Sequence, residues 1–167
     1  MDQLSFVYGI FRKVRSIMEA RIRVYSEVKN ETSVNRSRVD TTGLFTERNG
    51  SFYARYDEPE GSDLAGSATT IKWGAGTVTI LRTRPYELRE EFEQGRTFET
   101  TYHTPYMDIP LRIRTRRLAV FRKGRGWEIR LRYDSELGGE ASRIAVTVDV
   151  EPLQRQVCNV IKHMLQK

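Results

Sequence analysis

The side chains best suited to chemistry gather in residues 100–115, TTYHTPYMDIPLRIRT, which combine hydroxyls, two tyrosines and a histidine with alternating arginines. His103 could act as a general base if a nucleophile or an orienting carboxylate stood at a motif spacing, and none does. On an alternating strand that ends before Thr104-Pro105, His103 shares its face with Thr101, on the polar side. The pattern favours a corner between two strands over a catalytic site, with the proline fixing that corner.

The remaining nucleophiles and metal ligands are scattered along the chain. His163 is the second of two histidines, and Cys158 is the single cysteine. Two distant histidines and one cysteine do not suffice to predict a zinc site. Cys158 adjoins an apolar stripe, which favours packing over an activated thiolate. The sequence has no Walker loop, dinucleotide-binding glycine fingerprint or Gly-x-Ser-x-Gly elbow, and the glycines of residues 122–126 lead directly into a strand. We expect no catalytic residue, no metal and no cofactor, and therefore a protein that is not an enzyme.

A candidate anion-binding face is formed by alternating arginines on two predicted strands. Its members are Arg112, Arg114, Arg130 and Arg132, with Arg116 at the same parity as the first two. Such a face could bind phosphates, and its binding of nucleic acid would depend strongly on salt. Carboxylates on the same outer faces, at Asp108, Glu128 and Asp134, can pair with these arginines across strands. Aromatic side chains that would stack on bases are missing from this side, because Trp127 and Tyr133 point inward. The sequence therefore favours a solvated face over a nucleic-acid-binding one.

One carboxylate falls on the predicted inward side. In YELREEFEQG, Glu90 shares the apolar parity of Leu88 and Phe92, and a buried carboxylate is costly unless it meets a partner, water or a ligand. The candidate ligand cavity comprises Glu90, Thr100, Tyr102, Thr115, Trp127 and Tyr133. Two other interpretations stay open: Glu90 lies near a strand end and reaches solvent, or large inward side chains such as Trp73 fill the interior.

The elements that position these residues are antiparallel strands. Apolar residues recur at every second position in three clear runs: Ala20 to Val28, Trp127 to Tyr133, and Ile144 to Val150. Turn sequences separate the runs, the strongest being Asn49-Gly50, since both residues tolerate positive φ. About eight to ten strands at short spacing predict an all-β fold, an up-and-down barrel or a sandwich. Closure into one antiparallel barrel is favoured because it leaves no exposed edges.

The two ends of the chain have helical periodicity. Residues 1–17 predict an amphipathic N-terminal helix, either on a membrane or partner surface, or docked on the main domain; an extension upstream of a start at Met18 is a further alternative. Residues 18–151 form the barrel domain. Residues 152–167 predict a C-terminal helix that begins at Pro152 and packs on the barrel.

Composition limits the class of protein. The chain has 167 residues, and 28 lysines and arginines against 22 aspartates and glutamates give a net charge of +6, which permits an anionic partner without requiring one. No window approaches the roughly 20 apolar residues of a membrane span. A single cysteine fits a reducing cytoplasm, where we expect the protein to act.

Three segments together resemble the YwiB-like family of bacterial proteins of unknown function. They are TTIKWGAGTVTILRT, FEQGRTFETTYHTPYMDIPLRIRT and WEIRLRYDSELGGEASRIAVTVDV, over roughly residues 18–151. The family's Tyr-x-Thr-Pro corner corresponds to Tyr102, Thr104 and Pro105, although Met107 stands where the family usually has glycine. The resemblance implies a lipocalin-like (calycin) closed barrel without an established activity.

Two functions remain in competition. The leading one is a cytoplasmic, non-enzymatic barrel that binds a small, partly apolar ligand inside, since a barrel of about eight strands can just hold one ligand. The alternative is a module that binds protein or nucleic acid on the outer arginine face.

Overall fold

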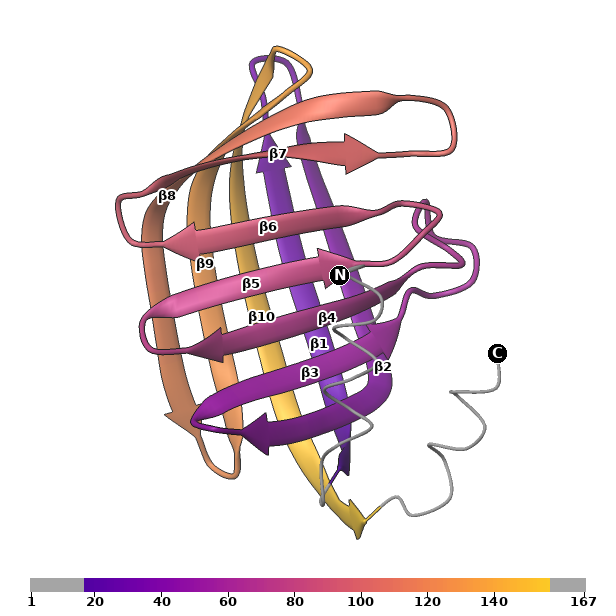
Figure 1. Ribbon diagram of the computed structural model, residues 1–167, viewed down its shortest axis with the longest axis vertical. Helices are drawn as coiled ribbons and strands as arrows, with labels where there is room; N and C mark the ends of the chain where they lie inside the picture. The colour runs from indigo at the N-terminus through magenta and orange to yellow at the C-terminus, as the bar shows by residue number, and fades with distance from the viewer. Residues whose placement is uncertain (1–16, 157–167) are drawn as a thin grey trace.

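The computed structural model describes residues 17–156, with side chains to residue 153, and in this range the chain folds into ten antiparallel strands (Figure 1). The strands are β1 (Met18–Lys29), β2 (Val34–Arg48), β3 (Ser51–Asp57), β4 (Ala68–Gly74), β5 (Thr77–Arg82), β6 (Leu88–Glu93), β7 (Thr97–His103), β8 (Asp108–Lys123), β9 (Gly126–Leu137) and β10 (Glu140–Gln156). The all-β class and the strand number are thus confirmed.

All ten strands belong to one sheet with the order β6-β5-β4-β3-β2-β1-β10-β9-β8-β7. The sheet curls until its two ends, β6 and β7, meet at an isolated bridge between Glu87 and His103. Two backbone hydrogen bonds tie the turn from β6 to β7 onto β8: the Gly95 N–H donates to the Thr115 carbonyl, and the Thr115 N–H donates to the Arg96 carbonyl. The result is a nearly closed barrel, with a seam between β6 and β7 where pairing is sparse.

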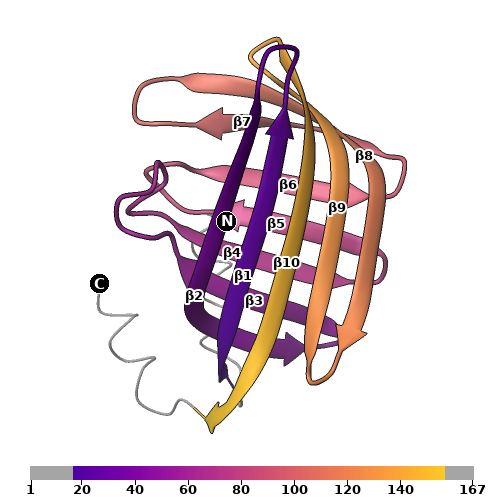
Figure 2. The ribbon, with the colours of Figure 1, turned by 180° about the vertical axis from the view of Figure 1, so that it is seen from behind.

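The barrel has two differently oriented walls. Figure 2 shows β1, β10, β9 and β8 running side by side as long strands, while β3 to β6 cross behind them at a steep angle. The chain turns from one wall to the other within β2, which pairs with β1 up to Phe45 and with β3 from Leu44. Gly43 lies at this corner, where a Cβ would stand 2.1 Å from the carbonyl oxygen of Arg55. The close backbone approach there requires glycine.

The core lies between the two walls, on the apolar parity that the sequence predicts. Ile22, Ile129, Leu131 and Val148 are completely or almost completely buried. One end of the interior holds an aromatic cluster of Phe45, Phe52, Trp73 and Trp127, in which the rings of Phe52 and Trp127 lie 4.5 Å apart. Burial of these rings stabilises the barrel chiefly through the hydrophobic effect.

A β-bulge interrupts β8 between Thr115 and Arg117. Thr115 pairs with Tyr133 and points inward. The neighbouring residue of β9, Arg132, pairs with Arg117 and not with Arg116, so Arg116 is the one extra residue of the bulge. Since side chains alternate strictly along a strand, the inserted residue reverses the parity of every residue after it. Leu118 and Val120 consequently face the core, and Arg117 and Phe121 face outward.

The turns follow their local chemistry. Asn49 and Gly50 adopt φ values of 51° and 76°, as the Asn-Gly hairpin signal predicts. At the corner between β7 and β8, the Thr104 hydroxyl accepts bonds from the backbone N–H groups of Tyr106 and Met107 and donates one to the Met107 carbonyl. TYHTPY is therefore a corner between strands, as expected, and Met107 fits it with φ outside the left-handed region.

The predicted helix start at Pro152 is wrong. Strand β10 continues through Pro152, which pairs with Ala20, to Gln156. The strand tolerates a residue without an N–H here because its register with β1 shifts between Met18 and Ala20. The rest of the predicted C-terminal helix, and the N-terminal helix before Ile17, lie outside the described residues. Between residues 17 and 156 there is no helix.

Candidate functional site

The outer face of the long-stranded wall carries the arginines that the sequence singles out. Arg112 and Arg114 on β8 and Arg130 and Arg132 on β9 are all exposed. Strand alternation and the antiparallel register place them beside outward residues of β10 and β1. The four arginines thus form part of a larger surface, which also includes Lys29, Arg116, Arg117 and Arg143.

Three carboxylates on this wall are engaged in ion pairs, whereas Glu136, opposite Arg112, forms none in the described structure. Asp134 accepts bonds of 2.6 and 2.5 Å from Arg116, the bulge residue. Glu128 pairs with Arg130 and with Lys123. Asp108 turns to His103, whose Nδ1 lies 2.8 Å from its carboxylate. Of the four predicted arginines, Arg130 is therefore neutralised, and Arg112 approaches Glu99 at 3.8 Å.

Apart from Arg122, whose guanidinium lies over the Trp127 ring, five cations on the described strands of this wall form no ion pair: Lys29, Arg114, Arg117, Arg132 and Arg143. Two pairs of them stand directly opposite one another across neighbouring strands. Lys29 of β1 is the partner of Arg143 on β10, and Arg117 of β8 is the partner of Arg132 on β9. Like charges in directly opposed positions destabilise a sheet. The wall thus carries positive charges that no carboxylate of the wall neutralises in an ion pair.

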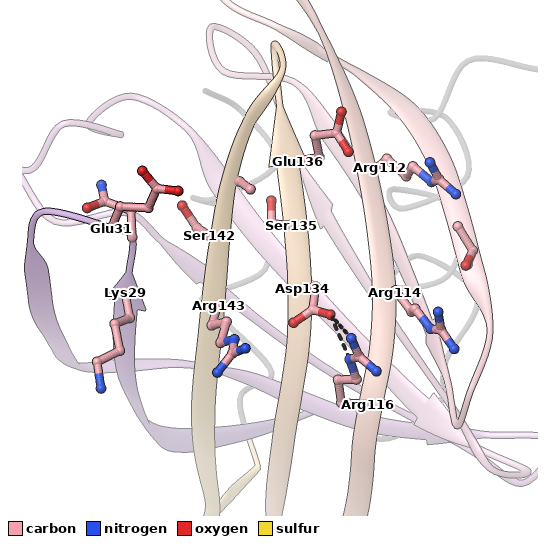
Figure 3. A pocket seen from close by; sticks show the side chains of 13 residues that line it. Lys29, Glu31, Arg112, Arg114, Arg116, Asp134, Ser135, Glu136, Ser142 and Arg143 are labelled. Atoms are coloured by element: carbon pink, nitrogen blue, oxygen red, sulfur yellow. Dashed lines mark hydrogen bonds and ion pairs between the residues drawn. The ribbon is translucent and has the colours of Figure 1, made fainter.

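Four of these cations, Lys29, Arg114, Arg132 and Arg143, line two adjoining hollows that together form the arginine groove. Arg117 lies beside the groove as the cross-strand partner of Arg132. One hollow, of about 610 Å³, is bordered by Lys29, Arg112, Arg114, Arg116 and Arg143, together with Asp134 (Figure 3). The second, of about 590 Å³, shares Lys29, Arg116, Asp134 and Arg143 with the first and adds Arg132. Ala145, beside Arg132 in the register, provides a small side chain in the second hollow. Glu31 and Glu136 border the first hollow toward the hairpin ends of β1 and β9.

Exposed aromatic rings do lie on this wall, contrary to the sequence-based expectation. Phe121 on β8 is 47% exposed, with the Arg130 guanidinium 5.2 Å from its ring centre. Tyr25 on β1 is 38% exposed, and Arg38 lies 5.2 Å from its ring centre. The expectation is wrong for Phe121 because the bulge in β8 reverses the parity after Arg116, and simple alternation does not include that extra residue.

Inside the barrel, Glu90 points inward, with 9% of its surface exposed. Within the described chain no side chain or backbone group donates a hydrogen bond to its carboxylate. Burial raises the pKa of Glu90 to about 7, and the positive charge of Arg82 opposes this rise. The carboxyl group is thus poised to exchange a proton near neutral pH.

A second buried carboxylate, Glu58, is hidden in the sequence because the surrounding residues 57–67 suggest a solvated acidic loop. It accepts a 2.6 Å hydrogen bond from Thr69, and Arg82 lies 3.8 Å away. Burial raises the pKa of the neighbouring Tyr56, and the charge of Glu58 adds to the effect. Arg82 thus lies near Glu58, and its positive charge also acts on Glu90.

The predicted cavity residues divide into two groups. Thr115 is 1% exposed, and its hydroxyl finds no hydrogen-bond partner. Tyr133 pairs with Thr115 across the strands, and burial raises its pKa, as does the charge of Glu90. Tyr102 and Thr100 are half-buried on β7, across the seam from β6. Trp127 does not join them, because it lies in the aromatic cluster, six residues or about 20 Å along β9 from Tyr133.

The His103–Asp108 pair is a carboxylate–imidazole contact that spacing along the sequence does not reveal. The two residues are five apart in sequence, yet they are direct partners across β7 and β8. Their side chains are 48% and 66% exposed. The nearby Thr104 hydroxyl is engaged with the backbone of the turn. The pair therefore lies on open surface without a prepared nucleophile beside it.

Within residues 17–156 no group of three or more acidic, histidine or cysteine side chains could hold a metal ion. The same part of the chain contains no helical segment suited to spanning a membrane.

Comparison with known proteins defines the class. The family described as Domain of unknown function (DUF1934) matches residues 22–146, so the chain belongs to it. Among solved structures, the ywiB protein from Bacillus subtilis superposes with a TM-score of 0.76 at 18% identity, covering 87% of this chain and 99% of that one. This likeness confirms the YwiB-like barrel fold expected from the sequence. No curated protein matches.

Proposed function

We propose that the protein is a non-enzymatic binding protein that holds a nucleic acid in its outer arginine groove. One observation carries the proposal: Lys29, Arg114, Arg132 and Arg143 line the groove and Arg117 adjoins it, and in the described structure none of the five forms an ion pair. Two pairs of them, Lys29 with Arg143 and Arg117 with Arg132, stand in directly opposed positions. Phosphates would supply the missing counter-charges, and neutralising them would release condensed ions from the nucleic acid. The single cysteine fits a cytoplasmic location for this activity.

The extent of the groove favours a polymer over a single phosphate. The free cations come from β1, β10, β9 and β8, which span about 14 Å at the usual strand spacing. The register places Lys29, Arg143, Asp134 and Arg114 in one row across the four strands, so Lys29 and Arg114 lie about three strand spacings, or roughly 14 Å, apart. A chain of linked phosphates can neutralise several of these cations at once. A lone phosphate reaches one or two.

Fluorescence anisotropy with a labelled nucleic acid tests the proposal. The triple substitution Arg114→Gln, Arg132→Gln, Arg143→Gln removes three free cations and changes the net charge from +6 to +3. We expect affinity to fall at least tenfold at moderate salt, because each phosphate left without its cation weakens the electrostatic part of binding.

The matched control is Arg84→Gln, Arg89→Gln, Arg96→Gln, which changes the net charge equally but removes arginines paired with Glu87, Glu91 and Glu93. Affinity should change little in this variant. An equal fall in affinity in the two triple variants would show that net charge alone matters, and the groove would then have no special role.

A second function, binding of a small, partly apolar ligand inside a lipocalin-like barrel, is favoured by Glu90 and Thr115. Both are at least nine-tenths buried. The Thr115 hydroxyl has no hydrogen-bond partner among the described residues, and the charge that acts on the Glu90 carboxyl is that of Arg82. Glu90 and Tyr133 remain 9% and 7% exposed, so a water-sized molecule can still contact part of each side chain. A ligand with a hydrogen-bond donor could meet Glu90, with its apolar part against Phe92 and Tyr133, whose rings lie 4.8 Å apart.

Native mass spectrometry of freshly purified protein tests this second function. We expect a small molecule to be retained by the unaltered chain and by Glu91→Ala, which removes an outward carboxylate of β6, and to be absent from Glu90→Ala. Retention by Glu90→Ala would exclude Glu90 as its anchor.

A further inference from the structure

The exposed aromatic residues beside the arginine groove bear on the form of the nucleic acid. Three aromatic side chains are substantially exposed in the described structure: Tyr25, Tyr106 and Phe121. Tyr106 belongs to the corner between β7 and β8. Tyr25 and Phe121 lie on the long-stranded wall, the same face as the free cations.

Each of the two wall aromatics lies a short way along a strand from the groove. Tyr25 is four residues from the groove residue Lys29 on β1, and Phe121 is four residues from Arg117, the cross-strand partner of the groove residue Arg132, about 13 Å in each case. Two strands separate β1 from β8, and on them the residues level with Tyr25 are Thr147 of β10 and Arg130 of β9. A strand whose phosphates occupy the groove could therefore extend its bases toward these rings.

Both rings are paired with a guanidinium. Arg38 lies over Tyr25 and Arg130 over Phe121, each at 5.2 Å from the ring centre. A planar cation beside an exposed ring gives two surfaces on which a base can stack, one aromatic and one cationic. Glu128 holds Arg130 and keeps that pair in position.

Duplex nucleic acid gains little from such platforms, because its bases are already stacked on one another and paired. Reading a duplex would instead require an element that enters a groove of the double helix. The outer face of a barrel wall has no projecting helix in the described range. Resting on the proposed function, we propose that the arginine groove binds single-stranded nucleic acid and that Phe121 and Tyr25 stack on its unpaired bases.

The test compares four ligands with the full chain: a mixed-sequence single-stranded oligonucleotide, the same oligonucleotide annealed to its complement, inorganic polyphosphate, and phosphatidylglycerol vesicles. The variants are Phe121→Leu and Tyr25→Leu, with Tyr106→Leu as the matched control, since Tyr106 is 84% exposed and lies outside the wall. Phe121→Trp is added because it preserves a stacking surface and keeps the test informative if Phe121→Leu folds poorly.

We expect Phe121→Leu and Tyr25→Leu each to weaken single-strand binding about tenfold, while Tyr106→Leu and Phe121→Trp bind as the unaltered chain does. Binding of polyphosphate and of the duplex should not change in any of these variants. Single-strand binding that Phe121→Leu and Tyr25→Leu leave intact would overturn the stacking inference, and so would an equal weakening of duplex binding. Vesicle binding without oligonucleotide binding would also overturn it.

Failure of the stacking inference differs from failure of the proposed function. If the unaltered chain binds polyphosphate, duplex and single strand equally, and the aromatic variants change nothing, the groove binds anions without stacking. If the unaltered chain binds no oligonucleotide, the proposed function itself fails.

Discussion

Arg117 and Arg132 are direct partners across β8 and β9, and in the described structure neither forms an ion pair. Two like charges in this position oppose folding, and they stand together because the β8 bulge places Arg117 on the outer face. We infer that the wall keeps these two positive charges for binding, although they lower the free energy of unfolding.

Reversing one of these charges should therefore stabilise the protein while weakening its binding. Arg117→Glu creates a cross-strand pair with Arg132, and we expect the free energy of unfolding to rise by about 0.5 kcal/mol. Urea unfolding measures this change, and oligonucleotide affinity should fall in the same variant. In the control, Arg112→Glu, the new carboxylate would face Glu136 and Glu99, so stability should fall. A drop in stability in Arg117→Glu as large as in Arg112→Glu would contradict the repulsion.

The buried Glu90 predicts an unusual dependence of stability on pH. Its pKa is about 7 when folded and close to 4.5 when exposed, so the folded state holds its proton more tightly. This contribution to stability is fully present below pH 4.5 and is lost as pH rises through 7. Glu90→Gln, which stays neutral, should gain up to about 3 kcal/mol relative to the unaltered chain between pH 4.5 and pH 8.

Urea unfolding of both proteins at several pH values checks the Glu90 prediction. Glu91→Gln is the control, because Glu91 lies outward in an exposed pair with Arg89. That variant should show no comparable trend. If Glu90→Gln and the unaltered chain keep a constant stability difference from pH 4.5 to pH 8, the carboxyl is not desolvated as described.

The unpartnered hydroxyl of Thr115 can be removed at little cost. Thr115→Val preserves the shape of the side chain and breaks no hydrogen bond, so stability should change by less than about 1 kcal/mol. Thr69→Val is the comparison, since its hydroxyl bonds to buried Glu58, and removing that hydroxyl should cost about 2 kcal/mol. Thermal unfolding distinguishes the two. Equal destabilisation would mean that Thr115 has a partner in the folded state.

The barrel corner at Gly43 should be intolerant of a side chain. A Cβ there would overlap the Arg55 carbonyl oxygen at 2.1 Å and approach the Ile22 side chain at 2.8 Å. We expect Gly43→Ala to lower the free energy of unfolding by about 3 kcal/mol, because the neighbouring backbone must shift. Thr42→Ala, at the neighbouring position, should change it little, and similar destabilisation in both variants would argue against a tight corner.

Alternating apolar residues are enough to predict a barrel, and they place Ile129 and Glu90 correctly on the inside. Three features lie beyond that pattern. The bulge at Arg116 adds a residue that no periodicity reveals, so alternation alone does not assign Phe121 to the outer face. Strand β10 continues past Pro152 because a register irregularity with β1 accommodates the proline. Asp108 meets His103, and Glu58 meets Thr69, through cross-strand or loop contacts that spacing along the chain does not encode.

The sequence predicts which residues lie in the candidate site, but it does not predict which of their charges are paired. Strand alternation alone puts Arg112, Arg114, Arg130 and Arg132 on the outer face, along with carboxylates able to neutralise them. Which cation each carboxylate selects depends on three-dimensional positions. In the folded chain Asp134 pairs with Arg116 and Glu128 with Arg130, and among the described residues Arg114 and Arg132 form no ion pair.

The salt dependence of oligonucleotide binding tests the central claim most directly. The slope of log affinity against log salt concentration counts the phosphates that the protein neutralises, at about 0.7 per phosphate for a single strand. We predict that Arg114→Gln, Arg132→Gln, Arg143→Gln reduces the magnitude of this slope by about 2, because three phosphates are no longer neutralised. An unchanged slope in that variant would contradict the claim that these free cations bind the phosphates.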